Sequence, residues 1–209
     1  MLEAPDLKAV RNDMLQHPET ICCILLAPKF SKLGFENIVL RFGYLDYRTG
    51  EDIHFYCAGY GGYWSKKSVP DMVDIGVGKY VGGTEIPWAF SQKLFATFVD
   101  ELEKETSWKY SGDSEIIILD PKVGFSGCII FKLDTMIKDG IINNPGELFE
   151  ALIQHARNHR GVNKFSLKGI ERISGEETVK AVLALLPKPF ENLWNVWKKG
   201  KHYTLVNIS

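Results

Sequence analysis

Long hydrophobic runs are missing from this sequence. The longest apolar run, Ile21–Ala27, has seven residues, whereas a helix that crosses a bilayer needs roughly 20. The first sixteen residues carry charges throughout and lack the apolar segment of a signal peptide. These absences predict a cytoplasmic protein with no membrane contact.

Cysteine is scarce and is not arranged for redox or metal chemistry. The chain has four cysteines, two of them adjacent, and no CxxC pair, so it has neither a zinc ribbon nor a dithiol redox motif. A nucleophilic cysteine needs a neighbouring base, and the sequence predicts no histidine beside the adjacent pair. We therefore expect four thiols that behave as small buried hydrophobic groups: Cys22, Cys23, Cys57 and Cys128.

Recognisable metal-binding motifs are also missing. His155 and His159 have a spacing that suits one helix face, but alanine follows His155 where an HExxH motif needs glutamate. Asp120 and Asp134 close predicted strands, and Asp46 would close a third if its segment is extended. Such carboxylates can hold Mg²⁺, but they are also ordinary turn-formers. Because no partner motif accompanies them, we expect no bound metal and no cofactor.

The chain has almost no net charge. A formal charge of −1 at pH 7 gives no overall attraction to nucleic acid or to an anionic membrane. With 209 residues, 45% of them hydrophobic, the chain can bury one sizeable core. We expect an α/β core domain with an N-terminal helix over residues 1–160, and a helix-and-strand extension over residues 161–209 that packs on it.

Hydrophobic periodicity predicts alternating helices and strands. The predicted helices are Leu2–Gln16, Ser31–Tyr47, Pro87–Trp108, Asn144–His159, Glu176–Leu186 and Pro189–Lys199. The predicted strands are Thr20–Ala27, Asp52–Ala58, Glu115–Asp120, Cys128–Asp134 and His202–Ile208, with an antiparallel hairpin formed by the third and fourth. The segment Ser31–Tyr47 also alternates as a strand would, but a helix keeps its charged residues off the apolar stripe.

From Thr20 to His159 the predicted order is strand, helix, strand, helix, strand, strand, helix, which resembles the thioredoxin-like fold. The residues after the first of these strands are Ala27-Pro28-Lys29-Phe30-Ser31, where the family carries its CxxC. Ile86-Pro87 is similar to the loop proline of the family, but it precedes a predicted helix and not the third strand. The resemblance implies a βαβ-α-ββ-α core with a C-terminal helical extension, without dithiol chemistry.

A glycine-rich segment, Gly59–Gly83, is the most informative feature. It contains seven glycines and three tyrosines, and it is predicted to be irregular. Glycines let backbone amides approach an anion closely. The P-loop pattern fails because Tyr80 follows Lys79, and the dinucleotide fingerprint fails because Val81 stands where glycine is needed. The predicted contact residues are Tyr60, Tyr63, Trp64 and Lys79.

Two functions are compatible with this segment. One is a non-redox thioredoxin-like module that binds a protein or a small ligand. The other is an enzyme acting on a nucleotide or another phosphate-bearing substrate, with Lys79 and a strand-end aspartate taking part. An ordered segment in which Lys79, His54 and carboxylates converge would favour the enzyme, and we favour the module.

An aromatic stripe lies near the end of the chain. Phe190, Leu193, Trp194 and Trp197 recur at helical spacing and are followed by lysines. Such a stripe can anchor a partner, but it more often docks a terminal helix on its own domain. We expect self-docking here.

Overall fold

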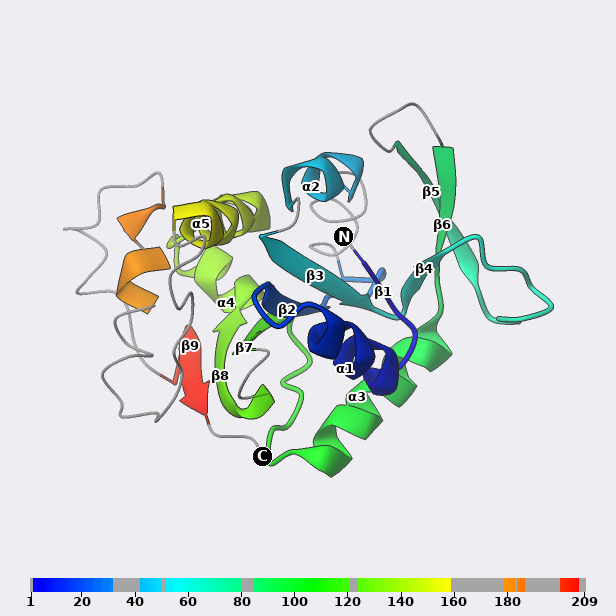
Figure 1. Ribbon diagram of the computed structural model, residues 1–209, viewed down its shortest axis with the longest axis horizontal. Helices are drawn as coiled ribbons and strands as arrows, with labels where there is room; N and C mark the ends of the chain where they lie inside the picture. The colour runs from blue at the N-terminus through cyan, green and yellow to red at the C-terminus, as the bar shows by residue number, and fades with distance from the viewer. Residues whose placement is uncertain are drawn as a thin grey trace.

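The computed structural model (Figure 1) describes residues 2–31, 42–49, 52–79, 85–120, 124–158, 179–182, 184–186 and 200–206. In chain order its elements are β1 (Leu2–Ala4), α1 (Leu7–Gln16), β2 (Ile21–Leu26), α2 (Phe42–Thr49), β3 (Ile53–Ala58), β4 (Tyr60–Gly62), β5 (Val73–Lys79), β6 (Glu85–Phe90), α3 (Gln92–Glu105), β7 (Glu115–Asp120), β8 (Gly124–Lys132), α4 (Leu133–Lys138), α5 (Pro145–Asn158) and β9 (Tyr203–Val206). The chain is therefore an α/β protein, as predicted.

The main sheet has six strands in the order β1-β3-β2-β7-β8-β9. Strand β3 is parallel to both β1 and β2, while the pairs β2–β7, β7–β8 and β8–β9 are antiparallel. Every residue of β2 is buried, which confirms the continuous apolar run as a strand covered on both faces. Its two cysteines, like the other two, are buried and free.

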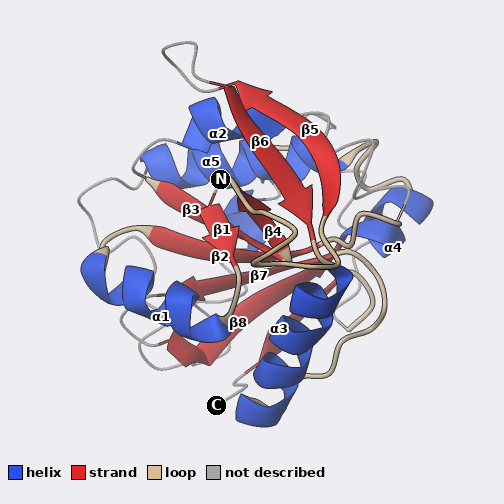
Figure 2. Ribbon diagram, turned by 90° about the vertical axis from the view of Figure 1, so that its right-hand side faces the viewer, coloured by secondary structure: helices blue, strands red, loops and turns tan. Residues whose placement is uncertain are grey.

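Helices cover both faces of the main sheet (Figure 2). On one face, Tyr56 donates to the carboxylate of Asp13 in α1, and the Leu7 amide at the start of α1 donates to Glu101 in α3. On the other face, the ring of Phe55 meets that of Phe149 in α5 at a centroid distance of 4.9 Å. Because successive strand residues point to opposite faces, this alternation follows from the sequence of β3.

The N-terminal helix begins later than predicted. The side chain of Asp6 accepts from the Ala9 amide at 2.7 Å, which makes Asp6 the N-cap, and α1 starts at Leu7. The prediction of helix from Leu2 is wrong, because Leu2–Ala4 pairs with β3 as an edge strand. Three residues are too few to show a strand period in the sequence.

Several other predicted elements are confirmed. Within the Ser31–Tyr47 segment, α2 shows that the helical alternative holds from Phe42, and residues 32–41 lie outside the described part. The antiparallel hairpin, α5 and the final strand are all present. Residues 179–182 and 184 are helical within the predicted Glu176–Leu186. The stripe with Trp194 and Trp197 lies outside the described residues.

The described part of the glycine-rich segment is irregular only between its two strands, β4 and β5. Strands β4, β6 and β5 form a second, antiparallel sheet in that order, which Figure 1 shows extending beyond the main sheet. The predicted helix Pro87–Trp108 is wrong in its first part, because Pro87 lies in β6. The helix α3 begins only after Ser91, whose hydroxyl accepts from the Leu94 amide at 3.0 Å.

Pro87 is tolerated in the central strand of this sheet. Its carbonyl accepts from the Tyr63 amide at 3.0 Å, just past the end of β4. The nitrogen and the carbonyl of one strand residue point to the same side, so the nitrogen of Pro87 also faces the β4 side. Pro87 therefore removes no hydrogen bond between β6 and β5.

Candidate functional site

The second sheet leaves the main sheet at the carboxyl end of the parallel strands. Gly59 follows β3 with a φ of 77°, and a Cβ there would lie 2.7 Å from that of Phe95. The Gly59 amide donates to the carbonyl of Ala4 at the end of β1. Open α/β sheets place their ligands at this edge. The sheet β4–β6 is therefore positioned where a binding surface is expected.

Tyr60 supports this sheet from inside. The side chain is fully buried, its ring lies 4.8 Å from that of Phe90, and its hydroxyl donates to the Ala27 carbonyl at 2.6 Å. Burial raises the pKa of Tyr60 far above its usual value. The prediction of Tyr60 as a contact residue is therefore corrected, because no ligand can reach a side chain held between β2 and β6.

Tyr63 has an uncommon backbone conformation and an exposed ring. Its φ is 57°, in the left-handed region that side chains other than glycine, asparagine and aspartate rarely adopt. The residue is 64% exposed. The turn is fixed from both sides: the Gly62 amide donates to Glu3 Oε1 at 2.9 Å, and the Tyr63 amide donates to the Pro87 carbonyl. Strained residues held in this way cluster at binding and catalytic sites.

Trp64 lies against the backbone of β4. A Cβ on Gly61 would overlap the indole ring, so only glycine leaves room for this approach. Gly61 is directly opposite Ala89 on β6, and Ala89 is buried. Trp64 is half-buried. The sequence predicts Trp64 as a contact residue, and in the structure the residue is partly exposed.

A short turn follows the two aromatic residues. The hydroxyl of Ser68 donates to the Ser65 carbonyl at 2.9 Å, and the Ser65 amide donates to the Ser68 hydroxyl at 3.2 Å. The Val69 amide also donates to the Ser65 carbonyl, at 2.8 Å. Lys66 and Lys67 lie at the tip of this turn, and both are exposed. We call residues Tyr63–Ser68 the aromatic–lysine turn.

Asp71 ties the end of this segment to helix α3. Its carboxylate accepts from the Ser91 hydroxyl at 2.7 Å and from the Lys93 amide at 2.9 Å. The Lys93 amide is the main cause that lowers the pKa of Asp71 below its usual value. The segment between β4 and β5 is thus fixed at both ends by hydrogen bonds.

Lys79, the fourth predicted contact residue, lies at the end of β5 opposite Glu85. Its side chain lies outside the described residues. His54 is near the beginning of β3, whereas the second sheet starts after β3 ends. His54 therefore lies at the opposite end of β3 from the start of the second sheet, to which Lys79 belongs.

A partly buried polar cluster between α1 and β3 was not predicted. His54 Nδ1 donates to Asp13 Oδ2 at 3.0 Å, and the Tyr56 hydroxyl donates to the same oxygen. Burial is the main cause that lowers the pKa of His54. The ring of His17 lies 5.0 Å from that of His54. His54 and Tyr56 are two residues apart in a predicted strand and so share one face. This spacing is the signal in the sequence that could have indicated the cluster.

The parallel pairing of β2 with β3 places Cys22 opposite His54. A histidine therefore does lie near this thiol, contrary to expectation. Cys22 is nevertheless buried, and desolvation raises its pKa well above the usual value. A covered, protonated thiol is not a nucleophile. Among the residues that the structure describes, no group of three or more His, Cys, Asp or Glu side chains could hold a metal ion.

The other residues considered for metal or acid–base chemistry are dispersed. Asp134 lies in the first turn of α4 and accepts from the Ser114 amide at 2.5 Å, so it joins α4 to the residue before β7. His155 is buried in α5, and His159 lies outside the described residues. The side chains of Asp46 and Asp120 also lie outside them.

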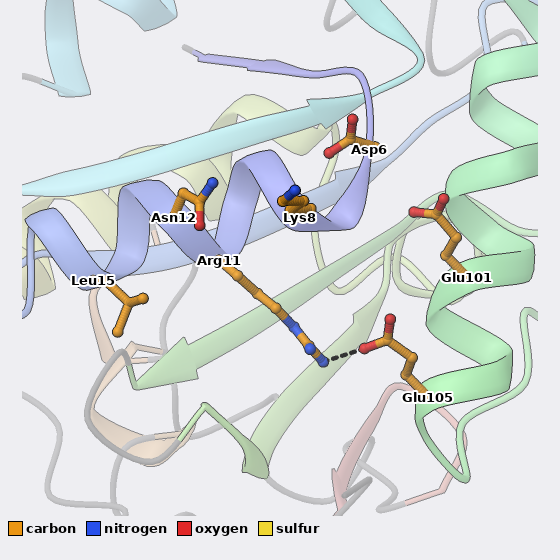
Figure 3. Close-up of a pocket in the computed structure, with 7 residues that line it drawn as sticks. All are labelled: Asp6, Lys8, Arg11, Asn12, Leu15, Glu101 and Glu105. Carbon is orange, nitrogen blue, oxygen red and sulfur yellow. Dashed lines mark ion pairs between the residues drawn. The ribbon is translucent and has the colours of Figure 1, made fainter.

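A charged groove of about 620 Å³ lies between α1 and α3 (Figure 3). Its charges are mostly used within the protein: Arg11 pairs with Glu105 and also lies over the ring of Phe125, while Glu101 caps α1. The lining residues are Asp6, Lys8, Arg11, Asn12, Leu15, Glu101 and Glu105. These contacts join two helices, and they leave few groups free to recognise a ligand.

Comparison with known proteins gives no relative for this chain. No protein-family model, no curated protein and no solved structure matches it. Within the described parts of the chain, no helix has both the length and the apolar character that a bilayer crossing requires. The function must therefore be argued from the geometry described above.

Proposed function

We propose that this chain is a non-redox, thioredoxin-like binding module of the cytoplasm, and that its contact surface is the aromatic–lysine turn of the second sheet. Strand order supports the fold assignment. The strands β3, β2, β7 and β8 are neighbours in that order, with the first pair parallel and the next two antiparallel. This is the arrangement expected of a βαβ unit followed by an antiparallel hairpin. The second sheet is then an insertion between β3 and α3.

The absence of redox chemistry is supported by the loop after β2. Residues 27–31 contain no cysteine, and all four thiols of the chain are free and buried. Phe30 of this loop is instead strongly exposed, and its ring lies 6.0 Å from that of Phe90 in the second sheet. The loop therefore contributes an exposed apolar side chain and no thiol.

The single observation that carries the binding role is the conformation of Tyr63. The protein holds this residue in a strained backbone region, and in doing so it presents a large aromatic ring to solvent. A core position would not need this arrangement, since exposing the ring contributes nothing to burial. Fixing a contact residue in advance lowers the entropy lost on binding. Tyrosine is also among the residues enriched at the centre of protein interfaces.

The glycines of the segment support a module more than an enzyme. Gly59 and Gly61 allow close packing against Phe95 and Trp64, and the amide of Gly62 is already used by Glu3. A phosphate-binding loop would leave such amides free to donate to the ligand. These glycines therefore shape the sheet and its turn.

Site-specific crosslinking tests the proposal, with a photoreactive phenylalanine derivative placed at Tyr63 in cells. The matched control carries the same group at Tyr47 on α2, because the two tyrosines are 64% and 65% exposed. We expect a discrete protein adduct from position 63 and none from position 47. The absence of an adduct at 63, or the same adduct from both positions, would contradict the proposal.

A further inference from the structure

The aromatic–lysine turn carries two adjacent lysines that form no ion pair with the described residues. Lys66 and Lys67 are adjacent and exposed, and no ion pair joins either one to a described carboxylate. Two acidic groups that hold this segment already accept hydrogen bonds: Glu3 accepts from the Gly62 amide, and Asp71 accepts from Ser91 and the Lys93 amide. The two ammonium groups are therefore available to an outside anion.

The two lysines and the two aromatic residues belong to one hydrogen-bonded turn. The reciprocal hydrogen bonds of Ser65 and Ser68 close the turn in which both lysines lie. Trp64, immediately before it, is seated on Gly61, and Tyr63 is held by hydrogen bonds from its own amide and from that of Gly62. Two aromatic residues and two lysines thus lie within one six-residue turn whose backbone is held by hydrogen bonds. The combination fits a ligand that carries an apolar side chain beside negative charges.

From this arrangement we infer that the partner of the turn is an acidic polypeptide segment, in which carboxylates flank an apolar residue. The inference rests on the proposed function and adds the chemical class of the partner. Carboxylates of the segment pair with Lys66 and Lys67, and the apolar residue lies against Tyr63 and the accessible part of Trp64. Charge pairs at the rim of such a contact mainly accelerate association and weaken as salt screens them.

Nucleic acid is the less favoured anionic partner. A protein that follows a phosphate backbone presents many basic residues along a groove or a face. Here the net charge of the chain is −1, and the positive tip consists of two adjacent residues, in a segment that is held by the carboxylates of Glu3 and Asp71. This distribution suits a short acidic segment and not a continuous track of phosphates.

Fluorescence anisotropy with defined probes tests the inference on the whole chain. The probe is a labelled peptide of alternating glutamate and leucine residues, and its control is a lysine–leucine peptide of the same length. We expect the acidic peptide to bind, binding to weaken with added salt, and the double variant Lys66→Glu with Lys67→Glu to weaken it about tenfold. The double variant Lys8→Glu with Lys104→Glu changes the net charge equally on two exposed helix positions, and it should bind like the wild type.

Three outcomes would overturn the inference. They are equal binding of the lysine–leucine peptide, no loss of binding in the Lys66 and Lys67 variant, and preferential binding of a labelled oligothymidylate. Exposed turn lysines do not support the core, so circular dichroism should show every variant folded. If crosslinking from Tyr63 succeeds while the acidic peptide fails to bind, the surface stands and the partner class is wrong. If crosslinking fails as well, the proposed function itself is wrong.

Discussion

Arg48 binds both carboxylate oxygens of Glu150, with Nη2–Oε2 and Nε–Oε1 distances of 2.6 Å and 3.2 Å, and so joins α2 to α5. Tyr44 also donates to Glu150, at 2.9 Å, and Arg157 of α5 donates back to the Arg48 carbonyl at 2.6 Å. Two hydrogen bonds in the plane of the carboxylate fix geometry as well as charge. This cluster therefore fixes the position of α2 over the sheet.

We predict that Glu150→Gln destabilises the protein by about 0.5–1 kcal/mol, because the pair is partly exposed and solvent screens it. The hydrogen bonds from Arg48 are the main cause that lowers the pKa of Glu150. A lowered folded-state pKa means that the contribution is present above the ordinary value of 4.5 and is lost as the pH falls below it. Urea unfolding at pH 7 and at acidic pH measures both effects. Tyr47→Phe on the same helix should change neither.

The approach of Trp64 to Gly61 gives a second prediction. Gly61→Ala should cost about 1–3 kcal/mol, because the added methyl group overlaps the indole and the sheet must shift. In a Trp64→Ala background the same change should cost little, since the ring that it meets is gone. Thermal unfolding of the four proteins of this cycle gives the coupling. If Gly61→Ala costs the same free energy of unfolding in both backgrounds, the contact with the Trp64 ring is not the reason that position 61 requires glycine.

Tyr60 and Tyr63 should respond oppositely to loss of the hydroxyl. Tyr60→Phe leaves the Ala27 carbonyl without its donor in a buried place, which should cost about 1 kcal/mol or more. Tyr63→Phe removes an exposed hydroxyl and should leave the free energy of unfolding unchanged. Chemical denaturation of both variants distinguishes the supporting tyrosine from the contact tyrosine. A larger loss for Tyr63→Phe would contradict this assignment.

Glu115 should make stability depend on pH in the direction opposite to Glu150. The side chain is only 1% exposed, and burial is the main cause that raises its pKa, although Ser111 donates to it. A raised pKa in the folded state means that the folded protein favours the protonated, neutral carboxyl group of Glu115. That stability is fully present below the ordinary value of 4.5 and is lost as the pH rises through the folded-state pKa.

In Glu115→Gln this loss should disappear, so at pH 8 the variant should equal or exceed the wild type in stability. Unfolding free energies measured from pH 4 to pH 8 test the slope. Glu85→Gln, at an exposed position of β6, should retain the wild-type profile. A profile of Glu115→Gln that matches the wild type would assign the dependence to another group.

The parts of the fold that the sequence predicted are those with a local signal. The apolar run of β2 and the Pro145 start of α5 need no distant partner to be recognised. The second sheet was missed because its strands are rich in glycine and contain Pro87, both of which disfavour strands. Only the pairing of β4 and β5 with β6 outweighs these preferences.

The candidate site could be predicted in part for the same reason. Tyr63 and Trp64 were expected as contacts from their composition and setting, and both are accessible. The burial of Tyr60 depends on the carbonyl of Ala27, thirty-three residues earlier, which no local pattern reveals. The cluster of Asp13 and His54 likewise joins residues of a helix and a strand that meet only in the folded chain.

The hydrogen bonds of β1 have a consequence for how the turn opens. Ala4 accepts from the Gly59 amide and Glu3 accepts from the Gly62 amide, so this three-residue edge strand holds the root of the second sheet. Short edge strands are among the first parts of a sheet to separate in local unfolding. Departure of β1 would release both glycine amides in a single event. Their hydrogen–deuterium exchange should therefore follow one time course, and that rate measures how often Tyr63 loses its support.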